Sequence, residues 1–159
     1  MNKCIFPGSF DPITKGHIDI CKKMSNFFDE ITFLFLENPQ KKSMFKLSDR
    51  ISFAKKALVT NPKIKIESYE GLLADYCAKN NIFAVIRGLR NSSDFNYEML
   101  YNLANKSLDT RIQMFFIPTS SKYLHISSSL IREIIKYKGK IDEFVPENIV
   151  DDIKKLSGY

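Results

Sequence analysis

Short apolar runs alternate along this chain with segments of helical periodicity, and this alternation restricts the fold more than any other feature of the sequence. The expected strands cover residues 4–6, 31–36, 64–67, 83–86 and 112–117. The first expected helix starts near residue 17, the next four cover 47–58, 72–78, 94–108 and 127–138, and the last starts near residue 146. Strands separated by helices need crossover connections, which are right-handed and give parallel sheets. The sequence therefore predicts a single α/β domain over residues 1–159, with a doubly wound, five-stranded parallel sheet.

The composition fits one such domain and restricts its environment. With 159 residues, 44% of them hydrophobic, the chain is long enough for a substantial core. No uncharged apolar run reaches about 18 residues, and the start lacks the apolar stretch of a secretory signal, so we expect neither a membrane span nor export. Three widely spaced cysteines without a CxxC pair suit the reducing cytoplasm and argue against a disulfide framework.

The net charge of +6 comes from scattered lysine doublets rather than from a basic run. A nucleic-acid-binding arm is therefore not expected. A basic balance of this kind also suits small polyanionic substrates such as nucleoside triphosphates.

A glycine-bounded turn, FPGSFDPITKGH, lies between the first expected strand and the first expected helix, over residues 6–17. A helix N-terminus presents free backbone N–H groups and the positive end of the helix dipole, which together bind anions. Ser9 adds a hydroxyl and His17 adds a ring N–H. The turn therefore predicts a site for phosphate esters.

His17 has two interpretations, a structural histidine at the start of a helix or a phosphate ligand. A lone histidine favours the first. The positive end of the helix dipole disfavours a charged ring, so a neutral ring that donates to a phosphate oxygen is the functional alternative. The other polar clusters of the chain favour this second interpretation.

Two further clusters follow later strands. The segment Arg87-Gly88-Leu89-Arg90 places two guanidinium groups around a glycine, and arginine forks bind phosphates through paired hydrogen bonds. A solvated surface pair is the alternative, although the buried run at 84–86 comes directly before Arg87. Residues 126–132, ISSSLIR, place three serines at a helix start, where capping alone needs one. This second cluster predicts another phosphate cradle.

Glu98 lies one turn into the long helix and could bind a ribose hydroxyl or an adenine amino group; a solvent-exposed glutamate is an equally good interpretation. Lys41 follows the second strand and Leu73 lies shortly after the third. Ligands of such folds bind outside the carboxyl ends of the strands, so all these clusters are expected at one edge of the sheet.

Several familiar signatures are missing. The chain has no GxxxxGK[ST] loop, no GxGxxG fingerprint and no kinase motif set. No Asp/Glu/His cluster predicts a metal cage held by the protein. Any Mg²⁺ is therefore expected to arrive on the phosphates of a nucleotide.

Five short segments carry a resemblance to a known family: residues 8–12 (GSFDP), 14–17 (TKGH), 87–90 (RGLR), 94–98 (DFNYE) and 126–129 (ISSS). Together they resemble the bacterial phosphopantetheine adenylyltransferases of the nucleotidyltransferase superfamily. Thr14 stands where the superfamily's HxGH motif has its first histidine, which is typical of this branch. Ser9 replaces the more usual threonine and keeps the hydroxyl, and His125 replaces an aromatic residue.

The resemblance implies a Rossmann-like fold, a cytoplasmic homohexamer, possible feedback by coenzyme A, and the reaction of ATP with 4′-phosphopantetheine to give dephospho-coenzyme A and pyrophosphate. The residues that it implies for phosphopantetheine are Ser9, Lys41, Leu73 and Arg87. The residues that it implies for ATP are Ser9, Phe10, His17, Gly88, Leu89, Arg90, Glu98, Tyr123, Leu124, His125, Ile126, Ser127, Ser128 and Ser129.

The nucleophile of this reaction, a phosphate oxygen, is already ionised, so no general base is required. Catalysis is then positioning and charge stabilisation, with His17 and Lys41 at the α-phosphate, and Arg90 with the serine triplet at the departing pyrophosphate. Two alternatives stay open at this point. One is another adenylyl- or cytidylyltransferase of the superfamily, and the other is a nucleotide sensor without catalysis.

Overall fold

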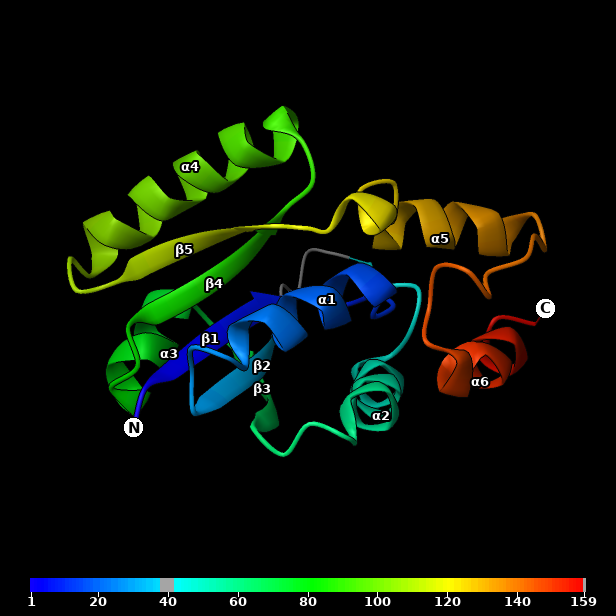
Figure 1. Cartoon of the computed structure of the whole chain (residues 1–159), viewed down its shortest axis with the longest axis horizontal. Coiled ribbons are helices and arrows are strands. Elements are labelled where there is room, and N and C mark those ends of the chain that lie inside the picture. Colours follow the sequence, from blue (N-terminus) through cyan, green and yellow to red (C-terminus); the bar gives the residue numbers. More distant parts are fainter. Residues whose placement is uncertain (38–41, 159) are drawn as a thin grey trace.

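A computed structural model describes residues 1–37 and 42–158 of the chain (Figure 1). The strands are β1 (Lys3–Gly8), β2 (Glu30–Glu37), β3 (Ile64–Glu70), β4 (Ala84–Leu89) and β5 (Gln113–Pro118). The helices are α1 (Lys15–Met24), α2 (Leu47–Leu58), α3 (Leu73–Asn80), α4 (Ser92–Leu108), α5 (Ser128–Lys136) and α6 (Val150–Leu156), with short 3₁₀ turns η1 (Ser121–Tyr123) and η2 (Glu147–Ile149). In the described ranges, no helix is both long and apolar enough to cross a membrane.

The five strands form one parallel sheet in the order β3-β2-β1-β4-β5. The chain builds outward from β1 to β3, then returns to place β4 on the other side of β1. This reversal between β1 and β4 is the topological switch point at which such sheets bind ligands. The predicted α/β class and the five-stranded parallel sheet are confirmed.

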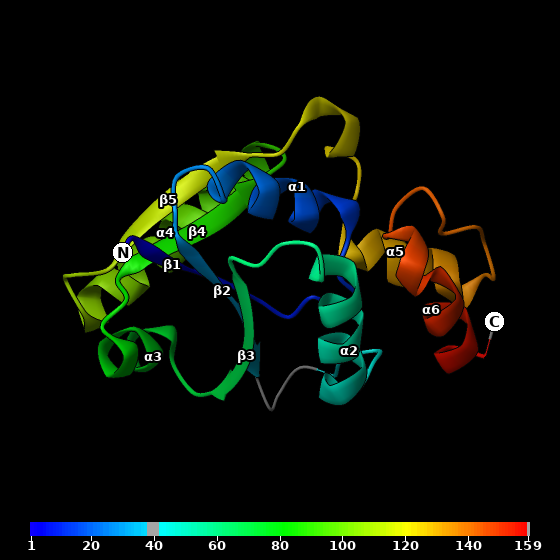
Figure 2. The same ribbon diagram turned by 60° about the horizontal axis from the view of Figure 1, so that its bottom comes forward.

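Helices cover both faces of the sheet because consecutive residues of its inner strands are apolar, so that both faces present apolar side chains. On one face, side chains such as Phe6 and Phe33 pack with α1, α2 and α5 in the larger core cluster. On the other face, Ile5, Leu34 and Val85 pack with α3 and with Tyr101 of α4. Figures 1 and 2 show α4 on the side of the strands opposite α1. Strands with two buried faces read as continuous apolar runs, which is why the sequence located them.

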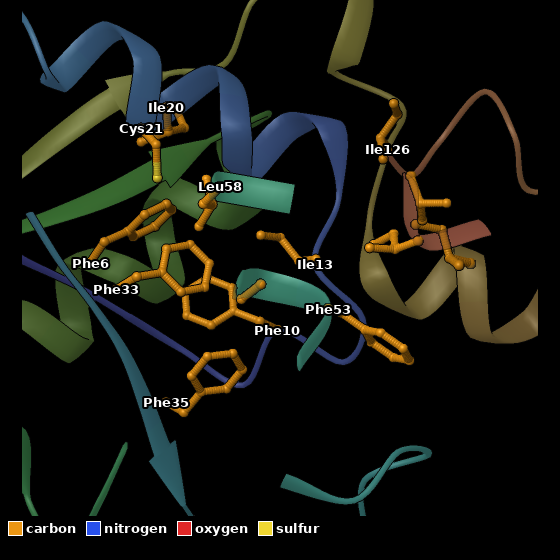
Figure 3. Packing of buried hydrophobic residues seen from close by; sticks show 14 of the residues in the cluster. Phe6, Phe10, Ile13, Ile20, Cys21, Phe33, Phe35, Phe53, Leu58 and Ile126 are labelled. Carbon is orange, nitrogen blue, oxygen red and sulfur yellow. The ribbon is translucent and has the colours of Figure 1, made fainter. Parts of the chain in front are cut away.

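An aromatic cluster fixes the β1–α1 turn to the sheet. The Phe10 ring stacks on Phe33, with 3.7 Å between ring centroids, and meets the edges or faces of Phe6 and Phe35 at 5.4 Å and 5.2 Å (Figure 3). Aromatic pairs at these separations contribute about 0.5–1.5 kcal/mol beyond burial. The turn backbone is therefore held by a ring that lies deep in the core.

Several expected boundaries need correction, among them the end of β3, which runs on from residue 67 to Glu70, and the start of α4, which begins two residues early at Ser92. Strand β4 runs on through Arg87, Gly88 and Leu89, which the sequence placed after it, because these residues pair in register with β5 as far as Leu89 opposite Pro118. Helix α5 starts at Ser128 and ends at Lys136, two residues before the expected end, because the next residues turn back. The last helix starts at Val150, after a 3₁₀ turn that follows residue 146.

Candidate active site

A cleft of about 320 Å³ opens at the carboxyl ends of β1 and β4, at the switch point of the sheet. The β1–α1 turn, the end of β4 and the start of α5 line it, with α4 along one side. The cleft brings together these predicted site residues: Ser9, Phe10, His17, Arg87, Gly88, Arg90, Glu98, Ile126, Ser127, Ser128 and Ser129. Segments that are far apart in the sequence thus converge as the strand order predicts.

Among the described residues, some predicted site residues do not line this cleft. Leu73 starts α3 and is buried in the second core cluster. Leu89 is the last residue of β4, and Tyr123, Leu124 and His125 lie in or just after η1. Lys41 lies outside the described residues. The roles implied for these residues stay predictions.

His17 is held in one tautomer by the start of its own helix. Thr14 is the N-cap of α1, and its backbone N–H donates to His17 Nδ1 at 3.0 Å, while its side-chain oxygen accepts from the His17 backbone N–H at 3.3 Å. Since Nδ1 acts as an acceptor, the ring proton resides on Nε2. His17 is therefore both a capping residue and a neutral donor for the cleft, so the two interpretations of the sequence are compatible.

The surroundings of His17 also oppose its protonation. Burial, followed by the positive charges of Arg90 and Arg87, lowers the pKa of its imidazole to about 3. The ring is thus neutral throughout the physiological range, as the helix dipole suggested. A phosphate oxygen would accept a hydrogen bond from it without any change in ring charge.

His17 is expected to make the free energy of unfolding depend on pH. The unfolded chain protonates this histidine near pH 6.5 and the folded protein only near pH 3, so the stabilisation is full above about pH 6.5 and is lost as the pH falls. Between pH 7 and pH 5 the loss should reach about 2 kcal/mol. Urea unfolding of the wild type and of His17→Gln at both pH values measures it. Equal pH sensitivity of the two proteins would contradict this expectation.

Arg87 and Glu98 form a bidentate pair across β4 and α4. The guanidinium donates to both Glu98 oxygens at 2.7 Å and 2.6 Å and to the Pro7 carbonyl of β1 at 2.6 Å. Glu98 is only 7% exposed, so the interpretation as a solvent-exposed glutamate is wrong. The interpretation of Arg87 as half of a solvated surface pair is also wrong, because its guanidinium is bound to Glu98 and to the Pro7 carbonyl. Arg87 keeps two N–H groups without a described acceptor, and these can still meet an anion.

Arg90 joins α4 to the start of α5. It donates to both carboxylate oxygens of Asp94 at 2.8 Å and 2.9 Å and to the Ile126 carbonyl at 3.2 Å. Fork geometry of this kind fixes the plane of the guanidinium. Arg90 is therefore preorganised beside the serine cluster.

The three serines do different things. Ser127 is the N-cap of α5, with its side-chain oxygen accepting from the Leu130 N–H at 3.1 Å, and the Ser128 hydroxyl donates to the Pro12 carbonyl at 2.8 Å. Ser129 is exposed and its hydroxyl lies 3.1 Å from that of Ser127. Capping, attachment of the turn and a solvent-facing hydroxyl together explain why one serine is not enough.

Arg132 and Asp11 lie in the predicted clusters at 126–132 and 6–17, but no role was predicted for either residue. Arg132 lines the cleft one helical turn after Ser128, and it donates to the Asp11 carbonyl oxygen at 2.7 Å. The Asp11 carboxylate accepts from the backbone N–H groups of Met44 and Phe45 at 2.7 Å and 3.0 Å. The spacing of four residues from Ser128 was a usable signal for Arg132. The contacts of Asp11 span more than thirty residues and left no local signal.

The balance of charge in the cleft favours a polyanion. Arg87, Arg90 and Arg132 face it, against the carboxylates of Asp94 and Glu98. The N-termini of α1 and α5 add their positive dipole ends, and neither helix has an acidic residue in its first turn. Two helix N-termini that open on one cleft can hold two phosphate groups.

Comparison with known proteins gives a consistent result. The family described as Cytidylyltransferase-like matches residues 5–134. The chain is 44% identical over 153 residues to a phosphopantetheine adenylyltransferase of Finegoldia magna, covering 96% of this chain and 94% of the relative. Relatives with the same name from Clostridium novyi and Caldanaerobacter subterraneus are each 42% identical, over 96% and 95% of this chain and 95% and 94% of their own lengths.

Proposed function

Since this chain belongs to the phosphopantetheine adenylyltransferases of the cytidylyltransferase-like family, we propose that the switch-point cleft is the place where it performs their reaction. The enzyme transfers AMP from ATP to 4′-phosphopantetheine, giving dephospho-coenzyme A and pyrophosphate, as a step of coenzyme A biosynthesis. The observation that carries the assignment to this cleft is the convergence of two helix N-termini and three arginines on it.

The chemistry needs no proton transfer from the protein. An ionised oxygen of the acceptor phosphate attacks the α-phosphorus of ATP, a new P–O bond forms, and the bond to the bridging oxygen breaks as pyrophosphate leaves with its electrons. Negative charge builds up on the α-phosphate oxygens and on the leaving group, so donors fixed in advance lower the barrier. His17, through Nε2–H, and Lys41 serve the α-phosphate.

The pyrophosphate is held by Arg90 and by the start of α5, at Ser127, Ser128 and Ser129. Support comes from the fixed plane of Arg90 and from the helix dipole beside it. Gly88, Leu89 and Glu98 hold the rest of the nucleotide, and the segment 123–126 wraps the triphosphate together with the serines that follow it. Ser9, Lys41, Leu73 and Arg87 bind the phosphopantetheine.

Mg²⁺ accompanies ATP in this proposal. Asp94 and Glu98 are the carboxylates of the cleft, and each is already engaged by an arginine. In residues 1–37 and 42–158 no group of three His, Cys, Asp or Glu side chains could hold a metal ion. These residues do not fit a protein-held metal, so the ion belongs to the nucleotide phosphates.

A pyrophosphate-release assay tests the function directly. ATP is supplied with 4′-phosphopantetheine, nicotinate mononucleotide or an alditol phosphate, and release is expected with 4′-phosphopantetheine alone. Release with another acceptor instead would favour a different nucleotidyltransferase of the superfamily. ATP binding without release from any acceptor would favour a nucleotide sensor.

The proposal extends to a cytoplasmic homohexamer with coenzyme A as a feedback ligand. One surface supports self-association. Tyr97, Leu100, Leu103 and Leu108 are exposed on α4, and their spacing places them on one face of that helix. A stripe of large apolar side chains on one face of a helix is typical of a protein–protein contact.

Leu100→Glu is expected to break this assembly into smaller species, because Leu100 is 69% exposed in the single chain and a buried charge disfavours the contact. Light scattering after size-exclusion chromatography measures the mass against the 18.4 kDa chain. Val59→Glu, at an isolated exposed apolar residue after α2, is the matched control and should keep the wild-type mass. An unchanged mass for Leu100→Glu would rule out this face.

A further inference from the structure

Arg50 is a buried charge that the reaction scheme does not use. It lies on α2 and is 4% exposed. Its Nε donates to the Phe45 carbonyl at 3.1 Å, and its two terminal nitrogens donate to the Ser9 carbonyl and to a Glu37 oxygen, each at 2.7 Å. The guanidinium also lies 5.9 Å from the centre of the Phe35 ring. One side chain thus joins α2, the end of β2 and the β1–α1 turn.

The contact with Ser9 fixes the plane of the Ser9–Phe10 peptide. This peptide is trans, so its carbonyl and its N–H point in opposite directions. Arg50 holds the carbonyl towards α2, so the Phe10 N–H points away from α2, and both Ser9 and Phe10 line the cleft. Within the described ranges, no protein group accepts from this N–H. A buried or cleft-facing amide without a partner is unusual unless a ligand supplies one.

The backbone of Phe10 is strained at this position. Its φ of +44° lies in the left-handed region, which non-glycine residues rarely adopt. The Phe10 ring, 3% exposed and stacked on Phe33, fixes one side of the residue (Figure 3). The other side is the peptide that Arg50 holds. Conformations of this kind persist when their surroundings over-determine them, and they gather at ligand sites.

We propose that Arg50 is a positioning residue that locks the Ser9–Phe10 peptide so that the Phe10 N–H donates to a phosphate oxygen of the nucleotide. If the peptide rotated, its carbonyl would face the cleft and repel the phosphates instead. The proposal rests on the proposed function, since it assigns a nucleotide phosphate to this cleft. It also explains how Phe10 can contact ATP when its ring is buried in the core.

The geometry requires arginine rather than another cation. Three acceptors lie in three directions around one planar group, and lysine offers a single point charge that cannot meet all of them. Asp11 braces the same region, because its carboxylate accepts from the Met44 and Phe45 N–H groups while Arg50 holds the Phe45 carbonyl. Arg50 and Asp11 therefore both hold the backbone around the Ser9 carbonyl in place.

Arg50→Lys tests the proposal, with Arg111→Lys as the matched control. Arg111 also forms a bidentate pair, with Asp109, but on an exposed surface outside the cleft. Calorimetry with ATP and steady-state kinetics are measured on the three proteins. A lost hydrogen bond to a charged oxygen should weaken ATP binding about tenfold or more in Arg50→Lys. KM for ATP should rise more than kcat falls, and Arg111→Lys should match the wild type.

The amide signal of Phe10 separates positioning from a general loss of structure. In a TROSY spectrum of the deuterated, ¹⁵N-labelled wild type, its proton should move downfield when ATP is added. In Arg50→Lys that shift should be lost while other signals of the cleft still respond. Wild-type ATP affinity in Arg50→Lys, or a Phe10 amide of the wild type that ignores ATP, would overturn the proposal.

Even if Arg50→Lys does not fold, the wild-type spectrum can overturn the proposal, because the contact of the Phe10 amide with ATP is measured on the intact enzyme. Failure of the proposed function looks different. A Phe10 shift with ATP in the wild type that is lost in Arg50→Lys, without pyrophosphate release from any acceptor, would keep the role of Arg50 and remove the reaction.

Discussion

His17→Ala is expected to lower kcat by about 10²–10³-fold, the usual cost of removing one fixed donor from a developing oxyanion. The Thr14 N–H at 3.0 Å from Nδ1 commits the other ring nitrogen to donation, and burial with two nearby arginines keeps the ring neutral. The donor therefore needs no protonation step and no reorientation when charge builds up on the α-phosphate. Pyrophosphate release under saturating substrates measures the effect.

The loss should appear in kcat rather than in the KM for ATP, since the hydrogen bond strengthens as the transition state forms. Thr14→Ser is the matched control, because it keeps the N-cap oxygen of α1 and should retain most of the activity. The variants are compared by thermal melting, so that a frayed helix start is not mistaken for a catalytic loss. Near-normal turnover in a folded His17→Ala protein would remove His17 from the mechanism.

The pH dependence of kcat is a second test of the protonation state of the His17 imidazole. With a pKa near 3, His17 contributes no ionisation between about pH 5 and pH 9. A protonated, cationic histidine would instead impose a fall in rate as the pH rises through its pKa.

Local patterns predicted much of this fold and part of the site. Apolar runs located the inner strands β1, β2 and β4, because strands buried on both faces have no polar alternation. The turn at Ser9 and the serines at 127–129 were predicted because both lie at helix starts, where residues that are adjacent in the sequence form the anion site together. The strand order then brings such segments together without further information from the sequence.

The partners of the charged groups could not be predicted in this way. Arg50 and Ser9 are 41 residues apart in the sequence, and Arg132 and Asp11 are 121 apart, so no local spacing predicts either hydrogen bond. Arg87 was expected beyond its strand because arginine and glycine usually interrupt a buried run. Pairing with β5 and a carboxylate on α4 keep it inside the strand instead. Long-range pairs of this kind come from the packing of elements.

Arg87→Ala should destabilise the protein by about 3–5 kcal/mol, because it leaves the Glu98 carboxylate buried without its partner. Glu98 is one of few buried acids, and both of its oxygens lose a hydrogen bond at once. The Pro7 carbonyl loses its donor as well. Urea unfolding at pH 7 measures the change in the free energy of unfolding.

A double variant identifies the cause. Arg87→Met with Glu98→Leu removes both charges and should recover most of the stability, since replacing a buried pair by apolar residues is often neutral. Arg111→Ala breaks the pair with Asp109 on the exposed surface and should change the stability little. If Arg87→Ala were no less stable than Arg111→Ala, the pair with Glu98 would contribute nothing measurable to the free energy of unfolding. Recovery in the double variant without recovery of pyrophosphate release would then show that Arg87 and Glu98, beyond holding the β4–α4 corner, also contribute directly to the cleft.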